Sequence, residues 1–308
     1  MTPQLSIVLA TDTAETIRPV IDRLLCQTLS HAIEIVIVSP SPFPDVPGFA
    51  AFRYAPHPVD DLASARAAGV RAASAPLVFI GETHSFPHPD FAALTIAAFA
   101  DPQWSVVVPA LRNANPSGIL SWSGFLCDYG AWAEELPTGP LSQVPVYNAT
   151  FRSQLLLNLG DRLPTALDQG DELVTALRMS GKQALFLPAS RVDHVNTTQF
   201  WPWIRNRFLG GLLIASNRSR LWPWHRRLVY AAGAFLVPAV LYPRLRSGLI
   251  ARTERGPAGT LAALFVSLGL RGAGETLGYA GLFTRIARSG MLDIELHKLK
   301  YAQSEATH

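Results

Sequence analysis

Cysteine is scarce in this chain of 308 residues, which holds only Cys26 and Cys127. Two cysteines cannot form the disulfide framework of a small secreted protein, and they are typical of a reducing compartment. Charged residues are also few, at 16% of the chain, whereas 49% of the residues are hydrophobic. So large an apolar fraction can offset the entropy cost of ordering a chain. The composition therefore excludes a disulfide scaffold and a disordered protein.

Several catalytic motifs are missing as well. The sequence has no glycine-rich loop that would cradle a phosphate, no cysteine and histidine spacing typical of zinc sites, and no Gly-x-Ser-x-Gly elbow. A secretory leader is not expected, because residues 1–4 carry no basic side chain and the apolar run over 5–10 is too short. We therefore expect the N-terminal part of the protein to be cytoplasmic.

The net charge of +3 hides a strong division along the chain. Residues 1–199 hold 11 basic and 18 acidic side chains, whereas residues 200–308 hold 15 basic and 5 acidic ones. The basic part is rich in tryptophan and arginine and contains two uncharged apolar stretches, 228–242 and 256–270. Each is shorter than the roughly 20 residues that a helix needs to cross a bilayer. They suit interfacial or tilted helices at an anionic membrane surface, whereas arginine and tryptophan alone would also suit single-stranded nucleic acid.

The acidic part alternates short apolar runs with helical patterns. Two runs rich in β-branched residues, 5–10 and 33–38, are separated by apolar residues at helical spacing over 17–25. The pattern continues with helices expected over 62–75, 91–100 and 167–180, and with strands expected over 77–80, 104–109 and 184–187. Strands separated by helices of this length predict an α/β fold whose parallel sheet carries helices on its faces.

Polar residues follow the predicted strands at their carboxyl ends, where open α/β sheets bind ligands. Glu82 and His84 directly follow the strand over 77–80, and a carboxylate and an imidazole there can hold a divalent cation against a diphosphate. His194 follows a later strand and is a candidate third ligand. The structural alternatives are an ordinary polar loop and a hydrogen-bonded histidine, and the residues alone leave both open.

Two carboxylates, Asp171 and Glu172, begin the helix expected over 167–180. The helix dipole favours acidic side chains in a first turn, which is a complete structural explanation for them. The functional alternative is that one of them accepts a proton from an incoming nucleophile.

The order of these parts resembles the family 2 glycosyltransferases of the GT-A fold. The resemblance covers about residues 4–199 and rests on ordered segments, namely 5–10, 24–28, 33–38, 65–69, 73–80, 86–91 and 147–152. It implies a GT-A domain over 1–199, with a Rossmann-like, mixed but mainly parallel sheet and flanking helices. Residues 200–308 are then a helical membrane-association region, and residues 272–281 are similar to the tails of membrane-associated members.

The resemblance also implies roles for single residues. Glu82, His84 and His194 would bind a divalent cation, Mn²⁺ or Mg²⁺, and Asp171 or Glu172 would be the catalytic base. Asn148 and Arg152 belong to the segment on the acceptor side. The residues expected to bind the nucleotide-sugar donor are Ala10, Thr11, Asp12, Ser39, Arg66, Glu82 and His84.

Two positions depart from the family pattern. Ser39 stands where the family usually has an aspartate that binds the nucleobase, and Glu82-Thr83-His84 stands in place of Asp-x-Asp. Histidine in the second motif shifts the preference toward borderline metals such as manganese. These departures motivate an alternative function, that of a catalytically degenerate glycosyltransferase-like binding or scaffolding partner.

The function expected from the resemblance is inverting sugar transfer in cell-surface polysaccharide biosynthesis. The donor would be a nucleotide-sugar and the acceptor a lipid-linked molecule or a glycan. The enzyme would lie at the cytoplasmic face of the cell membrane, peripheral, monotopic or shallowly inserted. Nucleic acid is not an expected partner, because a nucleic-acid groove does not need the two uncharged apolar stretches, 228–242 and 256–270. The formation of a homo-oligomer is left open.

Overall fold

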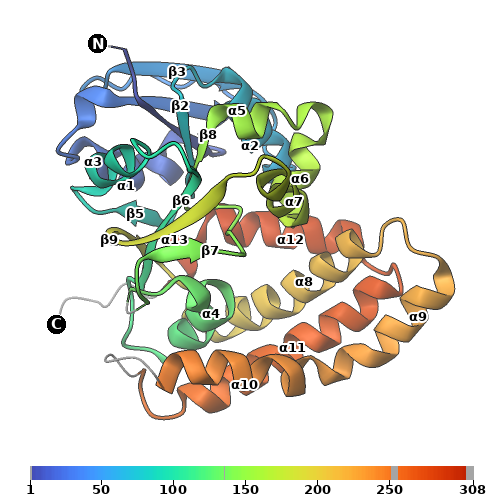
Figure 1. The fold of residues 1–308 in the computed structure, drawn as a ribbon. Helices are drawn as coiled ribbons and strands as arrows, with labels where there is room; N and C mark the ends of the chain where they lie inside the picture. The colour runs from blue at the N-terminus through green and yellow to red at the C-terminus, as the bar shows by residue number, and fades with distance from the viewer. Residues whose placement is uncertain (1, 135, 251–255, 303–308) are drawn as a thin grey trace. The chain divides into compact units, whose positions relative to one another are not determined.

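The computed structural model describes residues 2–134, 136–250 and 256–302, which form two compact units (Figure 1). Unit 1 comprises Met1–Arg112 and Trp132–Asp193, and unit 2 comprises Asn113–Ala131 and His194–His308. The C-terminal boundary between the units thus lies at the end of a strand, and a short segment from the middle of the chain belongs to unit 2. The predicted domains, 1–199 and 200–308, stay a prediction about domain organisation.

Unit 1 is built on a nine-stranded sheet with the order β3-β2-β1-β4-β8-β6-β9-β5, and β7 pairs with β9. The strands are β1 (Leu5–Ala10), β2 (Ile33–Ser39), β3 (Ala51–Pro56), β4 (Leu77–Ile80), β5 (Ser85–Pro87), β6 (Trp104–Asn113), β7 (Gly139–Leu141), β8 (Ala149–Arg152) and β9 (Gln183–His194). The first four strands pair in parallel, whereas β8 runs antiparallel to both β4 and β6. The expected α/β class with a mixed, mainly parallel sheet is confirmed.

Every residue of β1, β2 and β4 is buried, which explains why these strands appear in the sequence as continuous apolar runs. The helices of unit 1 are α1 (Ala14–Leu25), α2 (Leu62–Ala72), α3 (Phe91–Ala98), α5 (Ser153–Leu157), α6 (Leu163–Gln169) and α7 (Asp171–Met179), with short turns at η1 (Ser30–Ala32) and η3 (Gly160–Arg162). A further turn, η2 (Gly130–Trp132), contains the boundary between the units. Helix α2 packs on the sheet at Gly69, where a Cβ atom would lie 2.4 Å from Val8 Cγ1.

The expected helix over 167–180 is wrong as a single element. The structure has two helices there, α6 and α7, separated by Gly170 with a φ of 75°. This left-handed conformation ends α6 and is readily adopted only by glycine. Asp171 and Glu172 nevertheless lie in the first turn of a helix, as expected, because α7 begins at Asp171.

Unit 2 is helical, which confirms the expected C-terminal helical region. Its elements are α4 (Ile119–Tyr129), α8 (Phe200–Arg218), α9 (Trp224–Gly233), η4 (Ala234–Leu236), α10 (Val237–Ile250), α11 (Thr260–Tyr279), α12 (Thr284–Leu296) and α13 (Lys298–Tyr301). Helix α11 packs against α4, α8, α9 and α10 and is therefore the central helix of the unit.

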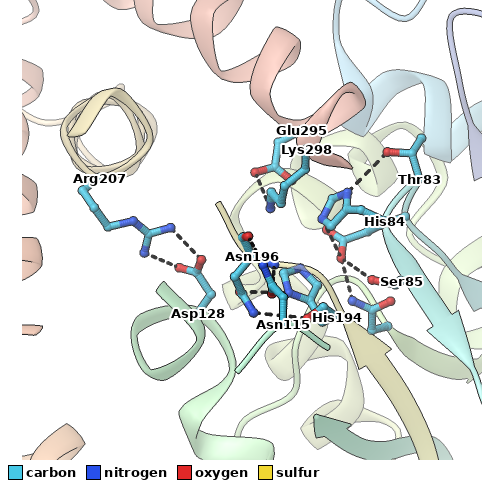
Figure 2. A network of polar contacts seen from close by, with 12 residues as sticks. Thr83, His84, Ser85, Asn115, Asp128, His194, Asn196, Arg207, Glu295 and Lys298 are labelled. Atoms are coloured by element: carbon cyan, nitrogen blue, oxygen red, sulfur yellow. Dashed lines mark hydrogen bonds and ion pairs between the residues drawn. The ribbon is translucent and has the colours of Figure 1, made fainter. Parts of the chain in front are cut away.

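A partly buried ion pair joins α4 to α8, with the Arg207 side chain 9% exposed and that of Asp128 37% exposed. The Arg207 guanidinium donates from Nη1 and Nη2 to the two carboxylate oxygens of Asp128, at 2.8 and 2.7 Å (Figure 2). Burial opposes ionisation of both groups, but their mutual attraction holds the pKa of Asp128 below its usual value and raises that of Arg207. A bidentate pair of this kind fixes the register of the two helices.

The two apolar stretches of the sequence have different surroundings. Residues 256–270 lie largely in α11, whose Ala263, Leu264 and Leu268 are buried in the unit. Residues 228–242 lie in α9, η4 and α10. Within the described residues, Trp224–Leu245 is the one helical segment that could cross a membrane by length and composition, and 11% of its apolar window is buried.

Candidate functional site

The carboxyl ends of the parallel strands meet at one edge of the sheet of unit 1. Ala10 at the end of β1 pairs with Val38, next to the end of β2, and Val8 pairs with Ile80 at the end of β4. The residues that directly follow the strands therefore lie along this edge. Asn148 reaches the same edge from the other direction, because β8 is antiparallel to β4 and begins opposite Ile80.

Glu82 is a buried carboxylate at this edge. Its Oε2 atom accepts hydrogen bonds from Asn148 Nδ2 at 2.6 Å and from Ser85 Oγ at 3.0 Å. The Nε2 atom of His84 lies 3.7 Å from the same oxygen, and His84 Nδ1 lies 3.3 Å from Thr83 Oγ1. Two neutral donors thus orient the carboxylate beside the imidazole.

His194 completes a group of three ligands. It is the last residue of β9, so the sheet holds its backbone, and its side chain is buried. One ligand atom each from Glu82, His84 and His194 lies within 4.8 Å of the others. A carboxylate oxygen and two imidazole nitrogens suit a borderline divalent cation better than Mg²⁺, which prefers oxygen ligands. The group of residues predicted to bind a metal is therefore brought together and fits a divalent cation.

Beyond the sheet, polar side chains surround His194 within unit 2 (Figure 2). Its Nδ1 lies 3.1 Å from Asn196 Oδ1, and its ring centroid is 4.5 Å from that of Tyr129. Asn196 in turn binds Asn113, the last residue of β6, and Asn115, two residues further along the chain.

The residues predicted to bind the donor nucleotide occupy the same edge. Thr11 is buried, its backbone N–H donates to the Val38 carbonyl and its hydroxyl donates to the Thr13 carbonyl. Asp12 accepts a hydrogen bond from the backbone N–H of Thr13.

The Ser39 hydroxyl is buried and accepts a hydrogen bond from the backbone N–H of Ser41. Ala10 is the last residue of β1. Their role in binding a base or a ribose stays a prediction.

Arg66 is a buried cation on α2. Its guanidinium carbon lies 3.7 Å from the centre of the Tyr147 ring, and its Nε atom has no hydrogen-bond partner among the described residues. No carboxylate of the described chain lies within ion-pair distance of it. A buried guanidinium without an anionic partner is costly, so the site suits an anionic ligand such as a diphosphate.

The two residues predicted to lie on the acceptor side have different partners. Asn148, with a φ of 55°, donates to Glu82 as described above. Arg152 donates from Nε to the Trp104 carbonyl at 2.8 Å and from Nη2 to the Phe99 carbonyl at 2.9 Å. These bonds tie Arg152 to the backbone of neighbouring elements. An acceptor-side role for either residue stays a prediction.

The two candidate bases lie in the first turn of α7. Glu172 has a buried carboxylate oxygen, Oε2, without a hydrogen-bond partner among the described residues. A buried acceptor that lacks a partner is uncommon in folded proteins and is compatible with a role in binding a ligand or a proton. The assignment of the base to Asp171 or Glu172 stays a prediction.

Sequence reasoning missed the side chains that orient the ligands. These are Ser85 beside Glu82, and Asn113, Asn115 and Asn196 around His194. Asn148 was expected on the acceptor side, and its hydrogen bond to Glu82 was not foreseen. For Asn148 the residue type is a signal, because asparagine tolerates the left-handed backbone that Asn148 adopts better than other non-glycine residues. Hydrogen bonds between residues that are distant in sequence leave no periodic pattern.

No protein-family model and no curated protein matches this sequence. Several solved structures are similar in part. One is GalNAc-T7 with UDP, GalNAc and Mn²⁺, at 15% identity and a TM-score of 0.46 over 62% of this chain. The chain spans 43% of the length of GalNAc-T7.

Two further structures cover nearly the whole chain. Residues 1–349 of S. aureus TarS in complex with UDP are 13% identical, with a TM-score of 0.43 over 94% of this chain and 91% of TarS. The mannosyltransferase PcManGT from Pyrobaculum calidifontis with GDP-Man and Mn²⁺ is 17% identical, with a TM-score of 0.47 over 97% of this chain and 88% of that chain. At TM-scores below 0.5, none of these similarities identifies the family of this chain.

Proposed function

We propose that unit 1 is a glycosyltransferase domain of the GT-A type that moves a sugar from a nucleotide-sugar to an acceptor hydroxyl with inversion. The observation that carries the proposal is the buried group of Glu82, His84 and His194. It lies at the carboxyl ends of strands in a mixed α/β sheet, the place where such sheets bind ligands. The ordered segments that resemble family 2 glycosyltransferases support the same assignment.

The three ligands would hold a divalent cation, with Mn²⁺ favoured over Mg²⁺ by the two imidazoles. A bound cation neutralises the negative charge that develops on a diphosphate leaving group. Arg66, the buried guanidinium without a carboxylate partner in the described chain, would bind the same diphosphate.

The transfer itself needs one base. The acceptor oxygen forms a bond to C1 of the sugar while the bond from C1 to the diphosphate oxygen breaks. The electron pair of that bond leaves with the nucleoside diphosphate, and the hydroxyl proton passes to the carboxylate of Asp171 or Glu172. Attack on the face opposite the leaving group inverts the configuration at C1.

Unit 2 would hold the enzyme in the plane of the membrane interface. The segment from α9 to α10 runs antiparallel along α11, because Thr276 Oγ1 donates to the Ala231 carbonyl at 3.3 Å and the rings of Tyr242 and Phe265 lie 5.6 Å apart. Helix α11 is packed on α8 and α4 as well. A segment that is packed along a helical core cannot cross a bilayer alone, so only its opposite face can meet lipid.

That opposite face is apolar and carries basic neighbours. Exposed large apolar side chains of this segment are Trp224, Leu228, Val229, Phe235, Leu236 and Val240. Residues 200–253 contain no aspartate or glutamate, and Arg226 stacks 3.9 Å over the Trp222 ring. Apolar and aromatic side chains beside arginines are typical of helices that lie at an anionic interface. We therefore propose binding to the cytoplasmic face of the cell membrane.

A lipid-linked acceptor, or a glycan under assembly at the membrane, would meet the enzyme at that surface. We therefore propose that the reaction belongs to cell-surface polysaccharide biosynthesis. The apolar, basic face of unit 2 supports this acceptor class.

The test measures metal and donor binding before turnover. We expect Mn²⁺ to bind wild-type protein in calorimetry and to enable binding of UDP or GDP. We expect Glu82→Gln to weaken Mn²⁺ binding about 100-fold, since it removes one of three ligands. The matched control is Glu15→Gln, the same change at an exposed position of α1, which should leave Mn²⁺ binding unchanged.

Turnover then separates the two functions expected from the sequence. Release of nucleoside diphosphate from a panel of UDP- and GDP-sugars supports the transferase. Binding of nucleoside diphosphate without release from any donor would instead favour the degenerate binding partner. If neither Mn²⁺ nor a nucleotide binds, or Glu82→Gln behaves like Glu15→Gln, the assignment of this site is wrong.

A further inference from the structure

The hydrogen bonds around His194 determine which of its two ring nitrogens carries the proton. A neutral imidazole has one N–H donor and one nitrogen with a free lone pair, and the partner of each nitrogen decides the tautomer. A donor of known identity in the surrounding hydrogen-bond network fixes the tautomer, because it fixes which of its neighbours accept. Such a donor is present beside His194.

The known donor is a backbone amide. The N–H of Asn115 donates to Asn113 Oδ1 at 3.2 Å, so this atom of Asn113 is an oxygen and an acceptor. The Asn196 amide places one of its two terminal atoms 2.9 Å from Asn113 Oδ1 and 3.1 Å from the His194 carbonyl oxygen. Both neighbours are acceptors, so the atom of Asn196 between them must be the donor Nδ2.

The other terminal atom of Asn196 is then its oxygen. Oδ1 lies 3.1 Å from His194 Nδ1, and it can only accept. His194 Nδ1 must therefore carry the proton and donate it to Asn196. Asn113 and His194 end β6 and β9, and Asn115 and Asn196 follow two residues later. The side chains of His194 and Asn196 are buried, so the bond between them is shielded from water.

We propose that Asn196 is a positioning residue that keeps the proton of His194 on Nδ1 and thereby leaves the lone pair of Nε2 for a metal ion. The inference rests on the proposed function only in naming His194 as a ligand, since the tautomer itself requires no metal. Partners that bind the second nitrogen of a histidine ligand typically contribute 10- to 100-fold to metal affinity.

The main experiment reads the tautomer in metal-free protein. Ring ¹⁵N chemical shifts are recorded with labelled histidine at about pH 8.5, where an ordinary imidazole is neutral, and His194→Gln identifies the signals of His194. We expect wild-type protein to show a protonated Nδ1 and an unprotonated Nε2. Asn196→Ala removes the acceptor and should give a mixture of both tautomers.

Two further variants separate the acceptor from the loop that carries it. Asn196→Asp keeps an oxygen opposite Nδ1 and should retain the wild-type tautomer, although it loses the donor to Asn113. Asn115→Ala loosens the same loop, because Asn115 binds the backbone N–H and carbonyl of Asn196. It should keep the proton on Nδ1, since Asn196 Oδ1 remains.

A second readout is the dissociation constant for Mn²⁺, which we expect to rise 10- to 100-fold in Asn196→Ala and less in Asn196→Asp. The inference is overturned if Nε2 carries the proton in wild-type protein, or if Asn196→Ala keeps the wild-type tautomer. It is also overturned if Asn115→Ala changes the tautomer as much as Asn196→Ala does. A correct tautomer in a protein that binds no Mn²⁺ would count against the proposed function alone.

Discussion

Among single residues, Glu34 shows how unit 1 accommodates a buried charge outside the candidate site. It lies in β2, its side chain is fully buried, and its carboxylate accepts hydrogen bonds from Ser6 Oγ, from the N–H and hydroxyl of Ser74, and from Arg53 Nε at 3.1 Å. Burial opposes ionisation, but these donors outweigh it and hold the pKa of Glu34 below its usual value. The carboxylate therefore joins β2 to β3 and to the end of α2.

We expect Glu34→Gln to lower the free energy of unfolding by about 2 to 3 kcal/mol, because the amide NH₂ cannot accept the bonds that one carboxylate oxygen accepts. Urea denaturation at neutral pH measures this effect. Glu15→Gln, the same change at an exposed position, should alter the free energy of unfolding by less than about 0.5 kcal/mol. If Glu34→Gln also changes the free energy of unfolding by less than about 0.5 kcal/mol, these hydrogen bonds make no net contribution to stability.

The depressed pKa of Glu34 also predicts a pH dependence. A carboxylate with a lower pKa in the folded state stabilises that state fully above the unfolded pKa, about 4.5, and loses this contribution as pH falls through the folded pKa. The stability difference between wild type and Glu34→Gln should therefore be constant at neutral pH and shrink below about pH 4.5. Denaturation series at several pH values measure it, and a difference that grows in acid would contradict the sign of the pKa shift.

Residue type predicted the ligands of the candidate site, but not their supports. Glu82 and His84 follow a strand that the sequence predicts, so their place at the sheet edge followed from chain order. The orienting bonds of Asn148 and Asn196 could not be predicted in this way, although Asn148 was expected on the acceptor side. Their hydrogen bonds reach Glu82 and Asn113, which are 66 and 83 residues away in the chain, and only folding brings them together.

At the scale of elements, α8 and α11 approach closely because glycine faces the partner backbone. A Cβ atom on Gly274 would lie 2.0 Å from the Phe208 carbonyl oxygen, and one on Gly278 would lie 2.2 Å from that of Leu212. No side chain fits at these distances. Residues 274–278 form a Gly-x-x-x-Gly sequence, which lets two helix backbones pack in direct contact.

We expect Gly274→Ala to destabilise unit 2 by about 3 kcal/mol, since the helices must separate to admit a methyl group. The matched control lies on the same helix, because a Cβ atom on Gly269 meets nothing within 4 Å. Gly269→Ala should raise stability by about 0.5 to 1 kcal/mol through helix propensity. Thermal unfolding compares the two variants, and equal effects would mean that the close approach does not limit the packing.

Element boundaries show where local patterns were insufficient. The apolar spacing over 167–180 continues across Gly170, and the break between α6 and α7 depends on its left-handed backbone. Strand β9 extends to His194, well beyond the apolar run over 184–187, because pairing with neighbouring strands supports its polar residues. The residues with which a strand pairs decide where it ends, and these residues lie elsewhere in the chain.

For the whole molecule, the charge division of the sequence matches a change of architecture. The acidic part contains the sheet of unit 1, and the basic part supplies most of the helices of unit 2. Residues 113–131 are the exception, since α4 belongs to unit 2 although it lies within the acidic part. Its ion pair with α8 explains the assignment.

We expect purified protein to bind vesicles that contain anionic phospholipid and to be released by salt, because each basic residue near the surface contributes about 1 kcal/mol that ions screen. Phe235→Asp should weaken binding at least 10-fold, since it removes an exposed apolar side chain from the proposed contact face. Vesicle sedimentation at several salt concentrations measures both effects.

The control for vesicle binding is Met179→Asp, a comparable loss of an exposed apolar side chain at the end of α7 in unit 1. It should leave vesicle binding unchanged. Binding that resists about 1 M salt and is unaffected by Phe235→Asp would contradict an interfacial helix. Equal binding to neutral vesicles would contradict the role of the arginines.

The sequence by itself determined the α/β class, the helical C-terminal region and the place of Glu82 and His84 after a buried strand. These follow from local periodicity and chain order, because a buried strand needs a continuous apolar run and an amphipathic helix needs apolar residues at helical spacing. Only the tertiary structure decided that His194 joins these two residues, that asparagines orient the ligands, and that residues 256–270 form a core helix. Each of these depends on contacts between distant parts of the chain, which burial and hydrogen bonding select only after the sheet and the helices have assembled.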